Sequence, residues 1–116
     1  MLATIRIETL QGVPVARLVG EVDASNAQDV GARLTEAVPN TAMGVVLDLS
    51  ETTYLDSSGV QLLFLLADRL RRRQQRLHVV VPPESFVGDV LQAVNLGGSA
   101  VVESTVVEAL DRLRAA

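Results

Sequence analysis

Two serine hydroxyls and a carboxylate stand side by side in the tetrapeptide Asp56-Ser57-Ser58-Gly59. The tetrapeptide lies between a Tyr-Leu pair and a long apolar run, which is where we expect a strand to end and a helix to begin. The first backbone N–H groups of a helix have no partner within the helix, and they can bind a phosphate. The sequence therefore predicts a modifiable serine at a helix N-terminus, and a binding surface that this one covalent charge can switch.

A purely structural interpretation is that Asp56, Ser57 and Ser58 only cap the helix, as Asp and Ser commonly do. A second loop favours the functional interpretation. The segment Gly20-Glu21-Val22-Asp23 closes an earlier strand just before the first expected helix. In a parallel α/β sheet, loops of this kind gather at the carboxyl edge of the strands. We therefore expect the two loops to share one edge of the sheet.

The other side chains offer little for nucleophilic catalysis or metal binding. The only histidine, His78, lies inside an expected strand, and the G-x-S-x-G turn of serine hydrolases is missing. One histidine and no cysteine argue against a structural zinc site, and the acidic residues lack the spacing of a calcium loop. All ten basic residues are arginine, which excludes Walker-type phosphate binding and Schiff-base chemistry by this chain. We expect no catalytic residue, no metal and no cofactor.

A phosphorylated-aspartate receiver domain is a competing interpretation, because that fold also alternates strands and helices and has an acid after its third strand. Asp48 would take that position. Receivers, however, resemble one another in an acidic pair after the first strand and a lysine near the last. The acidic pair is not evident in this sequence and the lysine is absent. We therefore exclude the receiver class.

Hydrophobic patterning predicts the element order ββαβαβαβα. The first two strands form a hairpin around Gln11-Gly12, and the third is an apolar, β-branched run that is typical of a central strand. The expected strands cover residues 3–8, 14–19, 44–49, 77–81 and 100–103. Strands that alternate with helices imply an α/β fold with a mixed, mostly parallel sheet and an N-terminal β-hairpin.

Four helices are expected between these strands. The first begins at Asp23 or Ser25 and ends near residue 37, and the second runs from about Ser58 to residue 74. Ser58 and Gln61 have the spacing of a capping box. The third helix covers residues 83–94 and ends at Gly97-Gly98. The last begins at residue 104 or 105 and continues to residue 113.

Length and composition fit one domain over residues 1–116. Hydrophobic residues make up 48% of the chain and aromatic residues only 3%, so the core must consist of aliphatic side chains. The scarcity of aromatics and the net charge of −4 argue against a nucleic-acid or anionic-membrane partner. The segment Met1–Arg6 lacks the charged start and unbroken apolar stretch of a signal peptide, and no apolar run is long enough for a membrane span. We therefore expect a cytoplasmic protein without membrane insertion.

Four segments together resemble the STAS domain family, and within it the single-domain anti-sigma factor antagonists of bacteria. They are the first loop (residues 20–23), Asp48-Leu49-Ser50, the tetrapeptide at residues 56–59, and Glu103-Ser104 with Glu108-Ala109-Leu110. Each segment is weak evidence alone, but together they are specific and span nearly the whole chain. One difference is Val60-Gln61, where many antagonists have Leu-Gly.

The resemblance implies that Ser57 is phosphorylated by a partner that is both an anti-sigma factor and a serine kinase, and that Asp23 lies beside it. The unphosphorylated chain would bind this partner and release a sigma factor, and a serine phosphatase would restore the unphosphorylated form. The expected binding residues belong to the two loops: Glu21, Asp23, Ser25, Asp56, Ser57, Ser58 and Gly59. We expect a monomer or a weak dimer that is not itself an enzyme.

A second function stays open. A STAS module that is not phosphorylated, such as the small subunit of a lipid-transport ATPase assembly or a component of a signalling scaffold, would use the same face for constitutive docking. A small α/β hydrolase or transferase is a more distant alternative.

Overall fold

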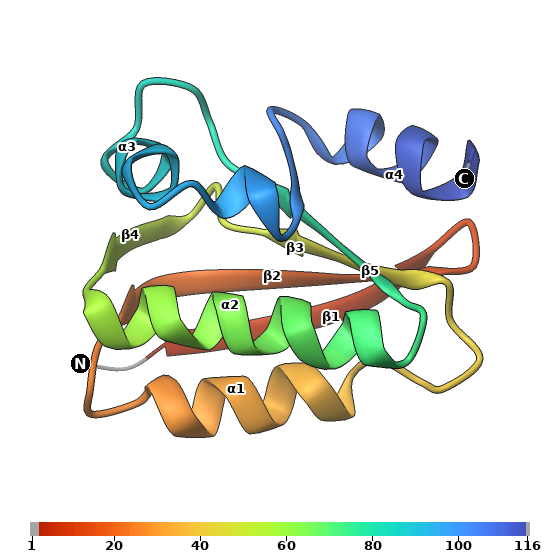
Figure 1. Cartoon of the computed structure of the whole chain (residues 1–116), viewed down its shortest axis with the longest axis horizontal. Helices are drawn as coiled ribbons and strands as arrows, with labels where there is room; N and C mark the ends of the chain where they lie inside the picture. Colours follow the sequence, from red (N-terminus) through yellow and green to blue (C-terminus); the bar gives the residue numbers. More distant parts are fainter. Residues whose placement is uncertain (1–2, 116) are drawn as a thin grey trace.

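One mixed sheet with helices on both faces forms the computed structural model, which describes residues 3–115 (Figure 1). Its strands are β1 (Ala3–Leu10), β2 (Val13–Val22), β3 (Gly44–Asp48), β4 (Thr52–Leu55), β5 (Arg76–Val80) and β6 (Val101–Glu103). Its helices are α1 (Ala27–Glu36), α2 (Ser57–Arg72), α3 (Phe86–Ala93), α4 (Val106–Ala115) and the short 3-10 helix η1 (Leu96–Gly98). Met1 and Leu2, which begin the segment considered for a signal peptide, lie outside the described residues.

The strand order is β1-β2-β3-β5-β6, and β4 pairs with β2. β1 and β2 are antiparallel and meet at a two-residue turn, in which Gln11 and Gly12 both have positive φ, as tight hairpin turns require. The other strand pairs are parallel. The predicted α/β fold, with a mixed, mostly parallel sheet and an N-terminal hairpin, is confirmed.

β2 changes its pairing partner along its length, and this change positions β4. The segment Val15–Arg17 pairs with β3, whereas Gly20–Val22 pairs with β4. The register shifts between Gly20 and Glu21, and Gly20 has a φ of 110°, which residues with a Cβ rarely adopt. The glycine of the first loop segment therefore permits the irregularity that lets β2 pair with a second strand.

Helices α1 and α2 cover one face of the sheet, α4 packs on the other, and α3 lies beside β4 (Figure 1). The side chains of β5 alternate between the two faces, as strand geometry requires. Leu77 and Val79 join the larger hydrophobic cluster, to which α1 and α2 contribute, and Val80 joins the smaller cluster beneath α4. Along its whole length α2 buries one side against the larger cluster, so the sheet holds its N-terminus in place.

Strand β4 and the end of the third helix differ from the prediction. The predicted order lacked β4, because only its first and last residues, Thr52 and Leu55, are buried, and four residues with that pattern show no strand periodicity. The third helix ends at Ala93 and is followed by Asn95 in the left-handed conformation, with φ of 56°. Asn95 takes the role that was predicted for Gly97-Gly98, which lie in η1 instead.

Candidate functional site

The loops after β2 and β4 are neighbours at one edge of the sheet. Val22 and Leu55 are paired in parallel register, and the backbone N–H of Asp56 donates to the Val22 carbonyl oxygen at 3.2 Å. Asp23 and Asp56 each follow one member of this pair. The structure therefore brings together the two acidic loops that the sequence analysis singled out.

Asp56 caps helix α2. Its backbone is extended, and its Oδ1 accepts hydrogen bonds from the backbone N–H groups of Ser58 at 2.8 Å and Gly59 at 3.2 Å. The helix begins at Ser57, so the predicted capping box that starts at Ser58 is wrong. Asp56 takes the cap because its carboxylate reaches two backbone donors at once. Ser57, at the first helical position, is exposed, and Ser58 is half-buried.

Gly59 lets α2 lie directly against the strand ends. A Cβ atom built at this position would be 2.9 Å from Leu55 Cδ2 and 3.2 Å from the Val22 carbonyl oxygen. Any larger residue would therefore push the first turn of α2 away from β2 and β4. The last residue of the tetrapeptide is needed for packing, and this packing determines where Ser57 stands.

The first loop is organised around the Asp23 carboxylate. Asp23 Oδ1 accepts from the backbone N–H of Ser25 at 2.9 Å and from the Ser25 hydroxyl at 2.5 Å. These two hydrogen bonds, the hydroxyl first, lower the pKa of Asp23 because they stabilise its ionised form. The Asn26 amide links the same loop together, since its Nδ2 donates to the Glu21 carbonyl oxygen at 2.9 Å. Asp23 therefore presents a negative charge at neutral pH.

The prediction that Asp23 or Ser25 caps the first helix is wrong. The N-cap of α1 is Asn26, which makes no side-chain cap hydrogen bond. Asp23 contributes through its main chain, because its carbonyl oxygen accepts from the N–H groups of Asn26 and Ala27. Ser25 is exposed and bonds to Asp23, while Glu21 is half-buried near the end of β2. Ser25 therefore lies in the loop after β2, whereas Glu21, predicted as a loop residue, is still part of β2 and pairs with Tyr54.

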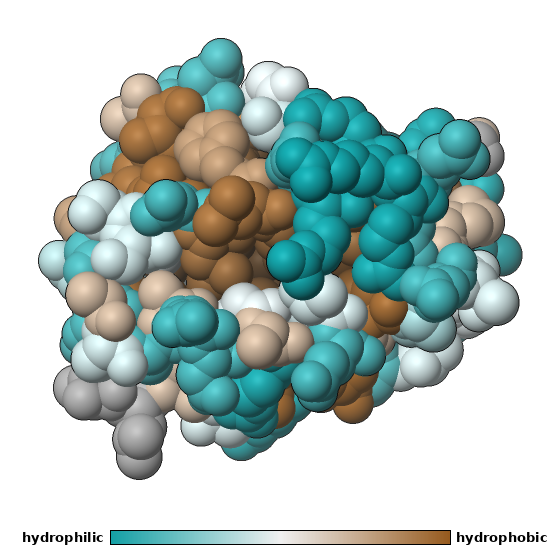
Figure 2. Space-filling view, turned by 60° about the horizontal axis from the view of Figure 1, so that its bottom comes forward, coloured by the Kyte–Doolittle hydropathy of each residue, from teal (hydrophilic) through white to brown (hydrophobic). Residues whose placement is uncertain are grey.

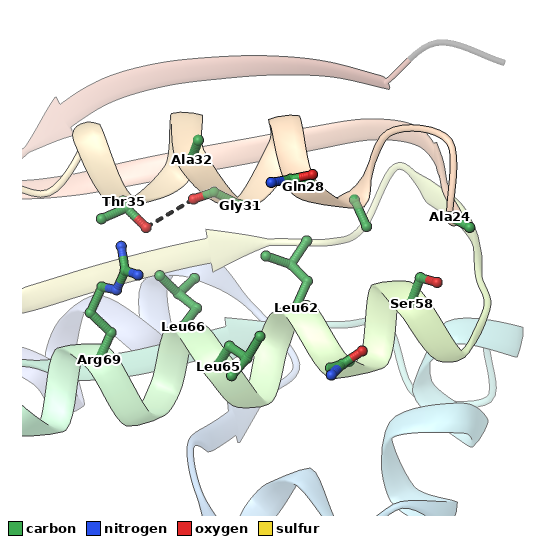
Figure 3. Close-up of a pocket in the computed structure, with 12 residues that line it drawn as sticks. Ala24, Gln28, Gly31, Ala32, Thr35, Ser58, Leu62, Leu65, Leu66 and Arg69 are labelled. Atoms are coloured by element: carbon green, nitrogen blue, oxygen red, sulfur yellow. Dashed lines mark hydrogen bonds between the residues drawn. The ribbon is translucent and has the colours of Figure 1, made fainter.

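A groove that the sequence analysis missed runs between α1 and α2 from this edge of the sheet (Figure 3). Its volume is about 490 Å³. Ala24 and Ser58 lie at the end near the two loops, and Thr35 and Arg69 lie at the far end. Between them the lining is mainly Ala, Gly and Leu. Figure 2 shows a hydrophobic area on this side of the molecule, bordered by hydrophilic side chains.

An exposed aromatic pair joins β4 to α3. Tyr54 of β4 and Phe86 of α3 stack with ring centroids 5.8 Å apart and an interplanar angle of 5°. Their exposed fractions are 40% and 54%. The pair could not be predicted from sequence, because the two residues are far apart in the chain and β4 was not predicted.

Asp48 and His78, which the sequence analysis considered for catalytic or signalling roles, are both buried in the structure and paired with other side chains. Asp48 is buried, receives a hydrogen bond from Arg17 Nε at 3.2 Å and caps the turn at Ser50. His78 lies in β5, as predicted, and its Nδ1 is 2.9 Å from Glu103 Oε2 in the interior. Within residues 3–115, no group of three His, Asp or Glu side chains is arranged to hold a metal ion. No helix in the same part of the chain is long and apolar enough to cross a membrane.

The model of the STAS domain family matches residues 4–113. The chain belongs to the STAS domain family. The match includes both loops, helices α1 and α2 that form the groove, and most of the final helix α4.

The chain is similar to BtrV of Bordetella bronchiseptica, which is named as a candidate anti-sigma factor antagonist. The two are 33% identical over 73 residues, and this match covers 63% of the chain and 63% of BtrV, less than two thirds of its length.

Solved structures share the fold. An anti-sigma factor antagonist from Mycobacterium paratuberculosis has a TM-score of 0.86 at 23% identity, over 97% of this chain and 95% of that protein. The anti-sigma factor antagonist SpoIIAA in its unphosphorylated form has a TM-score of 0.76 at 25% identity, over 97% and 98%. The phosphorylated form of SpoIIAA from Bacillus has a TM-score of 0.66 at 24% identity, over 96% and 100%.

Proposed function

We propose that this STAS domain is an anti-sigma factor antagonist that is switched by phosphorylation of Ser57. In its unphosphorylated form it binds an anti-sigma factor that is also a serine kinase, and a sigma factor is released. The observation that carries this proposal is the exposed Ser57 at the N-terminus of a firmly packed helix, next to the Asp23 loop. The names of BtrV and of SpoIIAA support the anti-sigma factor antagonist part of the proposal.

Phosphorylation adds about −1.5 to −2 charges at neutral pH. The N-terminus of α2 stabilises an anion there by at most about 2 kcal/mol, so the domain itself tolerates the modification. The phosphate would stand beside the carboxylates of Asp56 and Asp23, and the latter is held in its ionised form by Ser25. Modification of Ser57 therefore concentrates negative charge at one edge of the sheet.

Concentrated negative charge weakens an interface that was formed with the neutral serine. Burying the charges against a partner without matching cations costs several kcal/mol. A loss of about 2.8 kcal/mol already weakens binding a hundredfold. Repulsion and desolvation at the interface therefore outweigh the favourable effect of the helix end, and no refolding is needed. The kinase partner would supply ATP and magnesium, and a serine phosphatase would reverse the switch.

Calorimetry with the anti-sigma factor of the native host tests the proposal. Ser57→Ala is expected to bind like the unphosphorylated protein, and Ser57→Glu to bind much more weakly. The matched control is Thr9→Glu, because Thr9 is an exposed hydroxyl of β1 that lies in neither loop and does not line the groove. Equal affinities for Ser57→Ala and Ser57→Glu would contradict the switch and favour a constitutive STAS docking module.

Phosphate mapping tests the site itself. Incubation with the kinase partner and ATP is expected to add one phosphate, and peptide mapping should place it on Ser57. A phosphate on Ser58, or none, would contradict the assignment of Ser57.

A further inference from the structure

The groove between α1 and α2 has an aliphatic floor. Leu62 and Leu66 of α2 are buried and line the bottom of the groove. Gly31 of α1 faces Leu62 from the opposite helix. A Cβ atom at Gly31 would be 2.7 Å from Leu62 Cδ1, so the two helices approach closely and leave a shallow channel outside the contact. Leu65 forms one rim and is 62% exposed, the second-highest exposure among the large hydrophobic residues described.

One charged side chain closes the far end of the groove. Arg69 extends from α2 across the gap toward Thr35 of α1 (Figure 3). The nearest acid in sequence, Asp68, is already engaged, because its two oxygens pair with Arg71 at 2.9 Å and Arg72 at 2.7 Å. Arg69 makes no ion pair with any acid among residues 3–115. The groove therefore presents an aliphatic channel that ends in a positive charge.

The shape of the groove favours a protein segment over a small molecule. Small-molecule sites enclose most of their ligand, whereas this groove has exposed residues along its rims, among them Gln28, Ala32 and Leu65. The channel follows α2 from Ser58 to Arg69, about 16 Å at the rise of an α-helix. This length matches an amphipathic helix of about three turns, which buries an apolar face in such grooves.

We infer that the groove binds an amphipathic helix of the anti-sigma factor, with an aliphatic face against Leu62 and Leu65 and an acidic side chain paired with Arg69. The inference rests on the proposed function. It gives the partner a second contact region, besides the edge of the sheet formed by the Asp23 loop and residues 56–59, which we call the Ser57 edge. Ser58 lines the groove next to the phosphorylation site, so a helix bound there would end beside Ser57. Charge added at Ser57 would then act directly on the bound helix.

Two exposed groove residues make suitable test variants. Leu65→Gln removes an aliphatic contact and Arg69→Glu reverses the terminal charge, and neither residue supports the core. Matched controls on the opposite helix α4 are Val107→Gln, at a residue 67% exposed, and Arg112→Glu. With unphosphorylated protein and the native anti-sigma factor, each groove variant is expected to bind at least about tenfold more weakly, as interface anchors typically do. The α4 controls should bind like the wild type.

Charge reversal on the partner sharpens the test. Replacing the acidic residue of the partner helix by arginine should restore binding to Arg69→Glu and weaken binding to the wild type. A photo-crosslinker at position 65 should map to the same helix of the anti-sigma factor.

The possible failures are distinguishable. If the wild type does not bind the anti-sigma factor, both the proposed function and this inference are overturned. If the wild type binds and responds to Ser57→Glu but the groove variants bind normally, only the groove inference is overturned. If the groove variants change only self-association in sedimentation, the occupant is a second copy of the chain, and the inference is likewise wrong.

Discussion

The Ser57 edge and the His78–Glu103 pair both place polar side chains beside aliphatic packing, but they differ in their access to water. At the Ser57 edge, Asp56 and Asp23 accept hydrogen bonds from residues two or three positions further along the chain. His78 and Glu103 come from different strands, and their side chains are only 2% and 1% exposed. Local sequence holds the surface site together, whereas contacts between distant segments hold the buried pair.

If His78 or Glu103 is replaced, the remaining side chain has no other hydrogen-bond partner among the described residues. Among the described residues, His78 Nε2 and Glu103 Oε1 have no hydrogen-bond partner, so the contact between Nδ1 and Oε2 is the one that satisfies both side chains. At the Ser57 edge water can replace a lost partner. The comparison therefore predicts that substitutions change the free energy of unfolding strongly in the interior and weakly at the Ser57 edge.

The largest expected effect is that of Glu103→Ala. The substitution leaves His78 without its partner in the interior, which should lower the free energy of unfolding by about 3–5 kcal/mol. Denaturant unfolding measures this loss, and Glu8→Ala, at an exposed position of β1, is the control. Replacing both residues by leucine should cost less than Glu103→Ala alone, because no polar group is left unpaired. A double variant as unstable as the single one would contradict this account.

A smaller effect is expected from Gly59→Ala. The new Cβ would press against Leu55 and the Val22 carbonyl, and the resulting overpacking should cost about 1–3 kcal/mol. Gly97→Ala is the matched control, since a Cβ there would have no atom within 4 Å. Thermal or denaturant unfolding distinguishes the two variants. Equal stability of both would mean that α2 does not need to lie so close to the strand ends.

Asp56→Ala tests whether Asp56 stabilises the start of α2, whereas Ser57→Ala tests whether Ser57 has any structural role. Loss of the two hydrogen bonds to the first turn of α2 should lower the free energy of unfolding by about 1 kcal/mol. Ser57→Ala, at the exposed neighbouring position, should change it by no more than about 0.5 kcal/mol. If Ser57→Ala proved the more destabilising of the two, Ser57 would be a structural residue rather than a free phosphorylation site.

The smallest effect concerns the titration of Asp23. Its pKa lies below the ordinary value because Ser25 hydrogen bonds to its ionised form, so Ser25→Ala should raise that pKa. The stabilisation linked to this group is present above the pKa of the unfolded chain and is lost as the pH falls through the lower folded value. NMR titration of the Asp23 carboxyl carbon measures the shift. An unchanged Asp23 titration in Ser25→Ala would contradict the assigned cause.

Much of the Ser57 edge could be predicted from sequence because its interactions are local. The carboxylate of Asp56 accepts hydrogen bonds from the residues two and three positions further along the chain, and that of Asp23 accepts one from Ser25, two positions further along. Residue types and spacing therefore indicated a helix start and an acidic loop. The predicted caps at Ser58 and at Asp23 or Ser25 were wrong. Asp56 caps α2 with its side chain, whereas the N-cap of α1 is Asn26, which makes no side-chain cap hydrogen bond.

Other features depend on contacts that no short segment reveals. β4 was not predicted because its strand character comes from pairing with β2, made possible by the irregularity at Gly20. The Tyr54–Phe86 pair and the groove arise only when β4, α3, α1 and α2 are placed side by side.

The amino-acid sequence by itself determined the α/β class, the position of Ser57 where a strand gives way to a helix, and the two acidic loops, because periodicity and hydrogen bonds between near neighbours act over a few residues. Tertiary structure decided which side chains meet across the sheet and between the helices: Glu103 with His78, Tyr54 with Phe86, and the walls of the groove. These contacts join segments that are far apart in the chain, so no short sequence pattern predicts them. Packing of the whole aliphatic core brings the segments together.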